Sequence, residues 1–314
     1  MSSAPLRLGT RRSPMAVTQS QLVGRALTAR TGREVKLVGI DSAGDRSQEL
    51  LTQIGGTGVF VSALRSSLLA GEVDFAVHSL KDLPVEPAAG VALAAVPPRD
   101  DPRDALIGRD GAKLADLPAG ARIGTGSPRR AAQLLLLRPD IHPVPVRGNA
   151  GTRLAKVETG ELDAVVLAHA GLARIGKLDA VSQVFEPDEM LPAAGQGALA
   201  VECCTGREDL VALLASIDDA VSRAATTAER TLLGGLEAGC AAPVGAYAAG
   251  TDVLRLSGLV VAADGGMALR GSASGTLAQA ETIGRQLAAD LLSRGAGRYM
   301  AVSGGHLSSG DDDK

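Results

Sequence analysis

One local pattern occurs twice in this sequence, and it constrains the fold more than any other feature. "LGTRRSPMA" (8–16) and "IGTGSPRRAA" (123–132) both run from a strand through Gly-Thr to Ser-Pro and into a helix. The serine can cap that helix, and proline suits its first position. Backbone N–H groups at such a helix start favour anions. The repeat therefore predicts two similar α/β lobes, each directing a helix N-terminus at an anionic ligand.

Strand and helix patterns alternate around this repeat, which favours parallel sheets with crossover helices. The expected strands cover 6–10, 34–40, 73–79, 121–126, 141–148, 162–170 and 197–203, and the expected helices cover 14–32, 58–72 and 150–159. The strand at 197–203 is expected to return to the first lobe. The segment "AVPPRDDPRDA" (95–105) is expected to form the hinge between the lobes.

The chain of 314 residues is too long for one typical core, so several domains are expected. We predict an α/β protein with two lobes around a cleft and a small α+β C-terminal domain. A helical pattern up to about 237, a strand-like pattern over 246–274 and a helix at 276–295 define the third domain. The predicted boundaries are 1–97 with 196–217 for lobe 1, 102–194 for lobe 2, 220–303 for the third domain and 304–314 for a disordered tail.

Several function classes are disfavoured by composition. The net charge of −3 gives no reason to expect a nucleic-acid or membrane partner. The N-terminus has no apolar segment typical of a secretion signal, and no run approaches 18 apolar residues. Three cysteines do not form a disulfide framework, and none has a partner at metal-ligand spacing. We expect a cytoplasmic protein without a metal site.

Arginine supplies 26 of the 32 basic residues, and several arginines stand where expected strands end or helices begin. Arginine is unfavourable at a helix start because of the helix dipole, so its repetition there suggests a purpose. Guanidinium groups bind carboxylates bidentately, and the set fits a ligand with several carboxylates. Alternatively, each arginine is a solvated surface residue, and the excess of arginine over lysine reflects GC-rich codons. The set is Arg11, Arg12, Arg129, Arg130, Arg147, Arg153 and Arg174.

A carboxylate beside an ammonium ends the expected strand in "VDFAVHSLKDLP" (73–84). Asp82 could pair with Lys81 on the surface as an ordinary turn residue. It could instead be a catalytic carboxylate at the carboxyl end of a strand, where α/β folds place ligands. Cys240 has a similar pair of interpretations, as a small buried hydrophobe or as an accessible thiol for covalent attachment. Neither alternative is decided by the pattern alone.

Eight motifs, taken in order, resemble those of the porphobilinogen deaminase family over nearly the whole chain to about residue 300. They are "GTRRSPMA", "GDRS", "VHSLKDLP", "GTGSPRRAAQL", "VRGNAGTRL", "AHAGLARIG", "LPAAGQGALAVE" and "LEAGCAAPVGA". The resemblance implies two lobes of the type II periplasmic-binding-protein fold and a small third domain carrying a cysteine. We therefore expect a cytoplasmic monomer.

The resemblance also implies the activity, that of a hydroxymethylbilane synthase of tetrapyrrole and haem biosynthesis. This transferase condenses four porphobilinogen molecules head to tail, releases ammonia and frees linear hydroxymethylbilane by hydrolysis. A dipyrromethane cofactor, made from the same substrate, is implied to be attached to Cys240 by a thioether. Porphobilinogen is then the expected partner, with no nucleic acid and no membrane.

Residue roles follow from the matching motif positions. Asp82 is expected to be catalytic: it would hydrogen-bond pyrrole nitrogens, assist loss of the amine and stabilise the azafulvene-type cation. Lys81 is expected to hold an acetate or propionate group of the cofactor. The other implied cofactor-binding residues are Asp45, Ser79, Thr125, Ser127, Arg129, Arg130, Arg147 and Gly148. The implied substrate-binding residues are Arg11, Ser13, Gln19, Arg147, Arg153, Ala168, Arg174 and Gln196.

Two positions depart from the family's pattern. Thr57 stands in "GGTGVF" where a lysine is common, and Gly126 replaces a common serine. A rival class is a non-enzymatic bilobal binding protein for a polycarboxylate, because fold alone does not decide function. Such a binder needs neither Asp82 beside Lys81 nor Cys240 in a third domain. Those residues therefore favour the enzyme.

Overall fold

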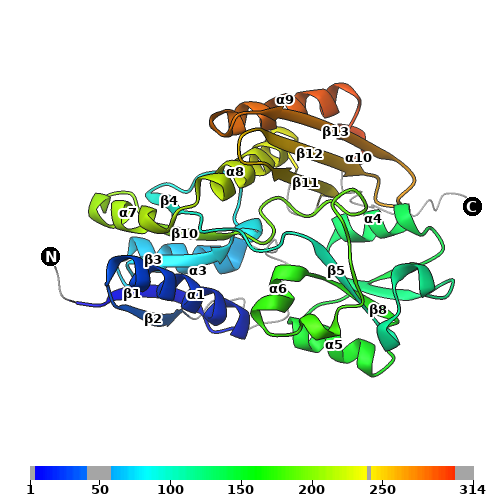
Figure 1. Ribbon diagram of the computed structural model, residues 1–314, viewed down its shortest axis with the longest axis horizontal. Helices are drawn as coiled ribbons and strands as arrows, with labels where there is room; N and C mark the ends of the chain where they lie inside the picture. The colour runs from blue at the N-terminus through cyan, green and yellow to red at the C-terminus, as the bar shows by residue number, and fades with distance from the viewer. Residues whose placement is uncertain (1–3, 41–57, 239–241, 301–314) are drawn as a thin grey trace, which may run out of the picture.

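The computed structural model describes residues 4–40, 58–238 and 242–300, and it contains three sheets. Two of them have the strand orders β2-β1-β3-β10-β4 and β7-β6-β8-β5-β9, and helices pack on both. The third, β11-β12-β13, is covered by helices α8 and α9 (Figure 1). We call the parts built on these sheets lobe 1, lobe 2 and domain 3. The expected fold class, two α/β lobes with a small α+β domain, is confirmed.

The elements of the three parts are as follows. Lobe 1 contains β1 (Leu6–Arg11), α1 (Pro14–Thr31), β2 (Val35–Ile40), α3 (Gly58–Leu69), β3 (Phe75–Ser79), β4 (Val91–Ala95), β10 (Leu199–Cys204) and α7 (Glu208–Leu214). Lobe 2 contains β5 (Asp104–Gly108), β6 (Arg122–Thr125), α4 (Pro128–Leu137), β7 (His142–Pro145), α5 (Ala150–Glu158), β8 (Ala164–Ala168), α6 (His169–Arg174) and β9 (Gln183–Val184). Domain 3 contains α8 (Ala220–Gly235), β11 (Val244–Ala249), β12 (Leu254–Val261), β13 (Ala268–Gly275), α9 (Ala280–Ser293) and α10 (Gly297–Met300).

The two helices of the repeated motif begin as the sequence predicts. Ser13 caps α1 by accepting from the backbone N–H of Ala16, and Ser127 caps α4 in the same way. Proline occupies the first position of both helices. Helix α1 is followed by Gly32, whose φ of 70° is the left-handed conformation that glycine adopts readily and that ends the helix. Local chemistry therefore fixes both helix starts at the ends of β1 and β6.

The sheets of the two lobes are mixed, which corrects the expectation of parallel sheets. β1 pairs in parallel with β2 and β3, but β10 runs antiparallel to both β3 and β4. In lobe 2, β5 is likewise antiparallel to β8 and β9. Each of these antiparallel strands enters directly from the other lobe, through 96–103 or 185–198, and is not preceded by a crossover helix of its own sheet. Strands β4, β5 and β9 were not among the predicted strands.

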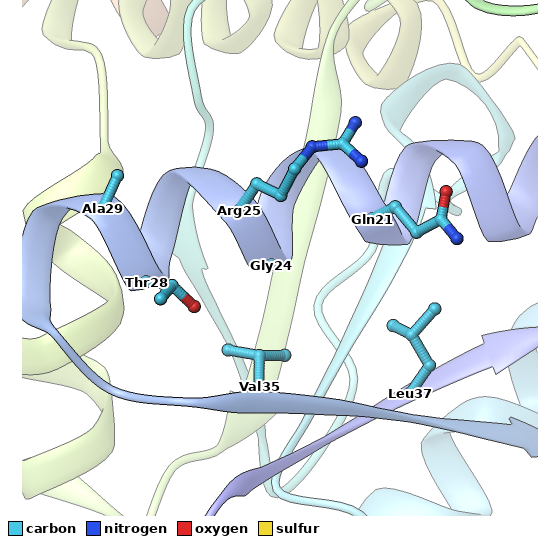
Figure 2. Close-up of a pocket in the computed structure, with 7 residues that line it drawn as sticks. All are labelled: Gln21, Gly24, Arg25, Thr28, Ala29, Val35 and Leu37. Atoms are coloured by element: carbon cyan, nitrogen blue, oxygen red, sulfur yellow. The ribbon is translucent and has the colours of Figure 1, made fainter.

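The cores are aliphatic, and lobe 1 also carries a groove away from the predicted site residues. Phe75 and Phe185 are fully buried among leucine, valine and alanine. Gly24 lets α1 approach β2 closely, since a Cβ there would lie 3.3 Å from a methyl group of Val35. Beside it, α1 and β2 border a groove of about 450 Å³ (Figure 2).

In the described ranges, no helix combines the length and apolar character needed to cross a membrane.

The adjacent residues Cys203 and Cys204 are both held within lobe 1. Cys203 is buried in the core of lobe 1, and burial raises the pKa of its thiol to about 11. The neighbouring Cys204 Sγ donates to the carbonyl oxygen of Leu68 over 3.1 Å. A thiol with so high a pKa is a poor nucleophile at neutral pH.

Candidate active site

Asp82 lies just beyond the carboxyl end of the central strand β3. The strand is buried up to His78, and the short 3₁₀ helix η2 (Leu80–Asp82) then turns the chain out of the sheet. Leu80 and Leu83 are buried and hold this turn against lobe 1. Asp82 is thereby placed at the wall of a cavity of about 230 Å³. A core strand ends in a carboxylate here because the turn presents that group at the sheet edge where α/β proteins bind ligands.

The same cavity receives the start of helix α1. It is lined by Arg11 from the end of β1, by the capping residue Ser13 and by buried Gln19. Gln19 Nε2 donates to Ser79 Oγ over 2.8 Å, which ties α1 to the strand that carries Asp82. A guanidinium next to a helix N-terminus attracts anions. The structure therefore brings these four predicted residues together with Asp82.

Lys81 points in another direction from Asp82 and joins the two lobes through a glutamine. Its Nζ donates to Oε1 of Gln196 over 3.2 Å, and Arg130 of lobe 2 donates to the same oxygen over 3.3 Å. Desolvation lowers the pKa of Lys81 to about 8, with a further lowering by the charge of Arg130, while Asp82 and Asp104 act in the opposite direction. An ammonium with this pKa is still largely protonated at neutral pH.

Asp104 is the centre of a buried ionic cluster in lobe 2. It is fully buried at the start of β5 and accepts from Arg129 Nη1 at 2.8 Å, Arg130 Nε at 2.9 Å and Gln196 Nε2 at 2.8 Å. Burial by itself would raise the pKa of Asp104, but the two guanidinium groups hold it well below its usual range. Ala168 pairs with Asp104 between β8 and β5. A carboxylate that the sequence analysis did not single out thus fixes three predicted site residues.

Arg129 and Arg130 are both buried and are also held by the backbone. Arg129 Nη1 donates to the carbonyl oxygen of Leu191 over 2.6 Å, and Arg130 Nη1 donates to that of Val166 over 3.1 Å. Burial lowers the pKa of Arg129 despite the nearby carboxylate. Among the described residues, the buried Nε of Arg129 has no hydrogen-bond partner. A buried donor of this kind lacks an acceptor that the described residues do not supply.

A second group lies at the carboxyl ends of β6 and β7. The N–H of Ser127 donates to Thr125 Oγ1 over 3.2 Å, and Arg153 Nε donates to the carbonyl oxygen of Gly148 over 3.0 Å. Burial lowers the pKa of Arg153, and the charge of Arg130 lowers it further. A Cβ on Gly126 would lie 2.8 Å from a backbone oxygen, so a serine would need the backbone to shift. Glycine in place of the family's common serine at position 126 is therefore consistent with the close approach of the ends of β6 and β7.

The other predicted residues are placed differently or are outside the description. Arg147 is exposed after β7. Arg174 binds Asp100 over 2.8 Å and donates to the carbonyl oxygen of Gly197 over 2.7 Å, so it contacts both segments that join the lobes. The predictions for Asp45, Thr57, Cys240 and the tail 304–314 fall on residues that are not described.

Sequence reasoning missed the residues of α8 that contact the interlobe segments and the turn of Asp82. Glu229 of α8 is fully buried and binds Arg99 Nη1 over 2.6 Å. It also accepts from the backbone N–H groups of Gly195 and Ala248. Arg230 donates to backbone carbonyls of the turn that carries Asp82. The sequence signal that could have identified these residues is the helical spacing of polar residues along α8, whose other face is apolar.

Two family models match this chain. The first, "Porphobilinogen deaminase, dipyromethane cofactor binding domain", matches residues 6–212. The second, "Porphobilinogen deaminase, C-terminal domain", matches residues 224–293. Together they span both lobes and domain 3.

Similar proteins carry the same family name. The porphobilinogen deaminase of Thermobifida fusca (strain YX) is 60% identical over 311 residues, covering 96% of this chain and 97% of the relative. Porphobilinogen deaminase 1 of Streptomyces coelicolor is 52% identical over 314 residues, covering 96% and 98%. The porphobilinogen deaminase of Mycobacterium tuberculosis is 50% identical over 305 residues, covering 94% and 98%.

Two solved structures illustrate a distant structural similarity. The VFT2 domain of Bordetella pertussis BvgS (double mutant F375E/Q461E) gives a TM-score of 0.41 at 17% identity, covering 68% of this chain and 85% of that chain. The methionine-binding protein MetQ gives a TM-score of 0.42 at 10% identity, covering 69% and 90%.

Proposed function

Because this chain belongs to the porphobilinogen deaminase family, we propose that Asp82 is the catalytic carboxylate of its hydroxymethylbilane synthase activity. The enzyme is a transferase that condenses porphobilinogen with loss of ammonia. The alternative, a non-enzymatic binding protein for polycarboxylates, is not favoured, because the family models and the relatives cover both lobes and domain 3.

One observation carries the proposal: Asp82 shares a cavity with Arg11 and the N-terminus of α1. Porphobilinogen has two carboxylates, a pyrrole N–H and an aminomethyl group that leaves as ammonia. Arg11 and the helix start can bind a carboxylate, while Asp82 accepts a hydrogen bond from the pyrrole N–H. The fixed negative charge of Asp82 then stabilises the substrate cation formed as ammonia departs. Gln19 keeps Ser79, and with it the end of β3, in place.

The family's dipyrromethane cofactor fits the residues that are described. Its several carboxylates require cations, and Arg129 is a cation whose Nε has no hydrogen-bond partner among the described residues. Lys81 and Arg130 converge on Gln196 from the two lobes, which places two further cations side by side. When bound, the cofactor supplies the nucleophilic pyrrole carbon from which the chain grows. We propose that it is held by Cys240, Lys81, Asp45, Ser79, Thr125, Ser127, Arg129, Arg130, Arg147 and Gly148.

Other residues have supporting roles in this proposal. Asp104 balances the charges of Arg129 and Arg130 and sets the planes of their guanidinium groups. Gln196 orients Lys81 because its Oε1 accepts a hydrogen bond from the Lys81 ammonium. The remaining proposed substrate-binding residues are Ser13, Gln19, Arg147, Arg153, Ala168, Arg174 and Gln196. We further propose a cytoplasmic monomer without nucleic-acid or membrane partners, with the domain boundaries given above.

The test is Asp82→Asn, with Asp82→Glu as the matched variant that keeps the charge. We expect Asp82→Asn to retain its melting temperature and to lose about 10²- to 10³-fold in kcat, the usual cost of removing one electrostatic stabiliser. Asp82→Glu should retain more activity than Asp82→Asn. Intact mass and mapping of the Cys240 peptide measure cofactor loading, and kcat is expressed per loaded protein. Turnover of Asp82→Asn at the wild-type rate would remove Asp82 from the mechanism.

A further inference from the structure

Helix α8 has two faces with different tasks. One face, which includes Ala228 and Leu232, packs in the core of domain 3. The other face carries polar residues at helical spacing and points to lobe 1 and the interlobe segments. On that face Ser222 Oγ accepts from the N–H of Arg99 over 2.9 Å, and Arg230 extends toward the turn that contains Asp82.

The guanidinium of Arg230 is occupied by this turn. It donates to the carbonyl oxygens of Pro84 at 2.6 Å and Leu83 at 3.0 Å, and more weakly to those of Leu80 and Val85, both at 3.4 Å. Helix and turn are also in close contact, since a Cβ on Gly234 would lie 2.9 Å from a methyl group of Val85. One side chain of domain 3 therefore contacts the backbone on both sides of Asp82.

Within the described residues, the turn makes few other backbone hydrogen bonds. Leu80 N–H donates to the carbonyl oxygen of Ala198, and Leu83 N–H donates to that of Leu80. Pro84 has no N–H to contribute. A planar guanidinium with five N–H donors can satisfy several carbonyls at once, which a single ammonium does less well. Arg230 thus supplies contacts that the sheet and η2 do not.

We propose that Arg230 is a positioning residue for the catalytic carboxylate: from domain 3 it fixes the turn 80–85, and thereby the position of Asp82. The inference rests on the proposed role of Asp82. Helix α8 ends at Gly235. In the sequence, the helix that holds the turn of Asp82 is therefore followed within five residues by Cys240, the predicted cofactor anchor.

The experiment compares Arg230→Gln and Arg230→Lys with the matched control Arg223→Gln. Arg223 lies two turns earlier on α8 and also donates to lobe 1 carbonyls, those of Leu93 and Ala94, but far along the chain from the turn of Asp82. We expect Arg230→Gln to lower kcat per loaded protein by about 10- to 100-fold, the usual cost of misplacing a catalytic group. KM for porphobilinogen should change little, because the Arg230 guanidinium contacts backbone. Arg230→Lys should recover part of kcat, and Arg223→Gln should keep it.

A double variant separates positioning from general loosening. In an Asp82→Glu background the carboxylate is already displaced, so Arg230→Gln should cost less there than in the wild type. Equal costs in both backgrounds, or equal losses of kcat in Arg230→Gln and Arg223→Gln, would overturn the inference. If Arg230→Gln does not fold, Arg230→Lys carries the same comparison. Full activity of Asp82→Asn would instead reject the proposed catalytic role of Asp82, whereas an inactive Asp82→Asn with a fully active Arg230→Gln rejects only the positioning role of Arg230.

Discussion

Asp104 shows how one buried side chain can define a site that it does not line. It is fully buried, and its two oxygens bind both Arg129 and Arg130. Two neighbouring guanidinium groups would repel each other without this charge between them. The Asp104 carboxylate therefore allows two neighbouring arginines to be positioned for an anionic ligand. The sequence pattern identified only the arginines.

Asp104→Asn should destabilise the protein strongly at neutral pH, by about 3–5 kcal/mol, because two buried cations lose their counter-charge. The pKa of Asp104 is held below its unfolded value near 3.9, so its contribution is complete above that pH and declines as pH falls below it. The difference between variant and wild type should therefore narrow in acid. Urea unfolding at pH 7 and at pH 3.5 measures both effects.

The control is Asp140→Asn. Asp140 is an exposed residue that binds Arg138 on the surface, and its removal should leave the urea midpoint nearly unchanged. If Asp104→Asn were as stable as this control at pH 7, the cluster would not depend on the charge of Asp104.

Lys81 should make cofactor acquisition sensitive to alkaline pH. Its pKa is lowered to about 8 by burial and by Arg130, so the ammonium needed to bind a carboxylate is lost as pH rises through that value. In protein purified without cofactor, the rate of mass gain on incubation with porphobilinogen should fall above about pH 8. In Lys81→Arg the alkaline decline should move to higher pH, because guanidinium stays protonated. An unchanged alkaline limb in Lys81→Arg would assign the titration to another group.

At the scale of elements, the backbones of the two interlobe segments come into tight contact at Gly197. Asp100 N–H donates to the carbonyl oxygen of Gly197, and Arg174 donates to the same oxygen. Gly197 has a φ of 87°, and a Cβ there would lie 2.4 Å from the carbonyl oxygen of Asp100. The positive φ disfavours any residue with a side chain, and the contact with Asp100 leaves no space for one. The packing of the two interlobe segments therefore depends on Gly197.

Gly197→Ala should lower stability by about 2–4 kcal/mol, because backbone strain and a backbone clash add together. Gly176→Ala is the matched control: Gly176 has a φ of 66° with nothing within 4 Å of a Cβ. It should cost only the conformational penalty, about 1 kcal/mol. Guanidinium unfolding of both variants gives the comparison. Equal losses of stability in Gly197→Ala and Gly176→Ala would mean that the backbone near Asp100 moves away from the new methyl group without a free-energy cost.

Sequence reasoning predicted the elements with strong local signals and missed those set by distant contacts. The Ser-Pro helix starts at 13–14 and 127–128 were predicted because capping chemistry is local. β5 was missed because its burial depends on β8 and β9, whose pairing no local pattern shows. Asp82 and Lys81 were identified from their motif, but their divergence toward a cavity and toward Gln196 is a tertiary property. The same holds for Asp104 and Glu229, acids whose burial only the assembled lobes reveal.

At the scale of the whole molecule, domain 3 is joined to the lobes through buried charge. Glu229 binds Arg99 of one interlobe segment and the N–H of Gly195 in the other, and it also accepts from the N–H of Ala248 in β11. Both segments and the sheet of domain 3 therefore meet at one carboxylate. Loss of that charge affects contacts between domains more than contacts within them.

Glu229→Gln should uncouple domain 3 from the lobes. We expect one thermal transition in the wild type and two in the variant by calorimetry, because the buried guanidinium of Arg99 loses its counter-charge at a cost of about 3–5 kcal/mol. Glu281→Gln removes an exposed pair with Arg285 on α9 and should leave the wild-type profile. A single transition at the wild-type temperature for Glu229→Gln would show that other contacts suffice.

The position of β10 between β3 and β4 has a consequence for the order in which the protein is made. The ribosome delivers β1 to β4 within the first 95 residues, but the strand that fills the gap between β3 and β4 begins only at Leu199. Lobe 2, whose strands all lie between Asp104 and Val184, has its complete sheet available earlier. The second lobe in the chain is thus the first that can finish folding during synthesis, while in the nascent lobe 1 the edges of β3 and β4 that β10 will join are still unpaired.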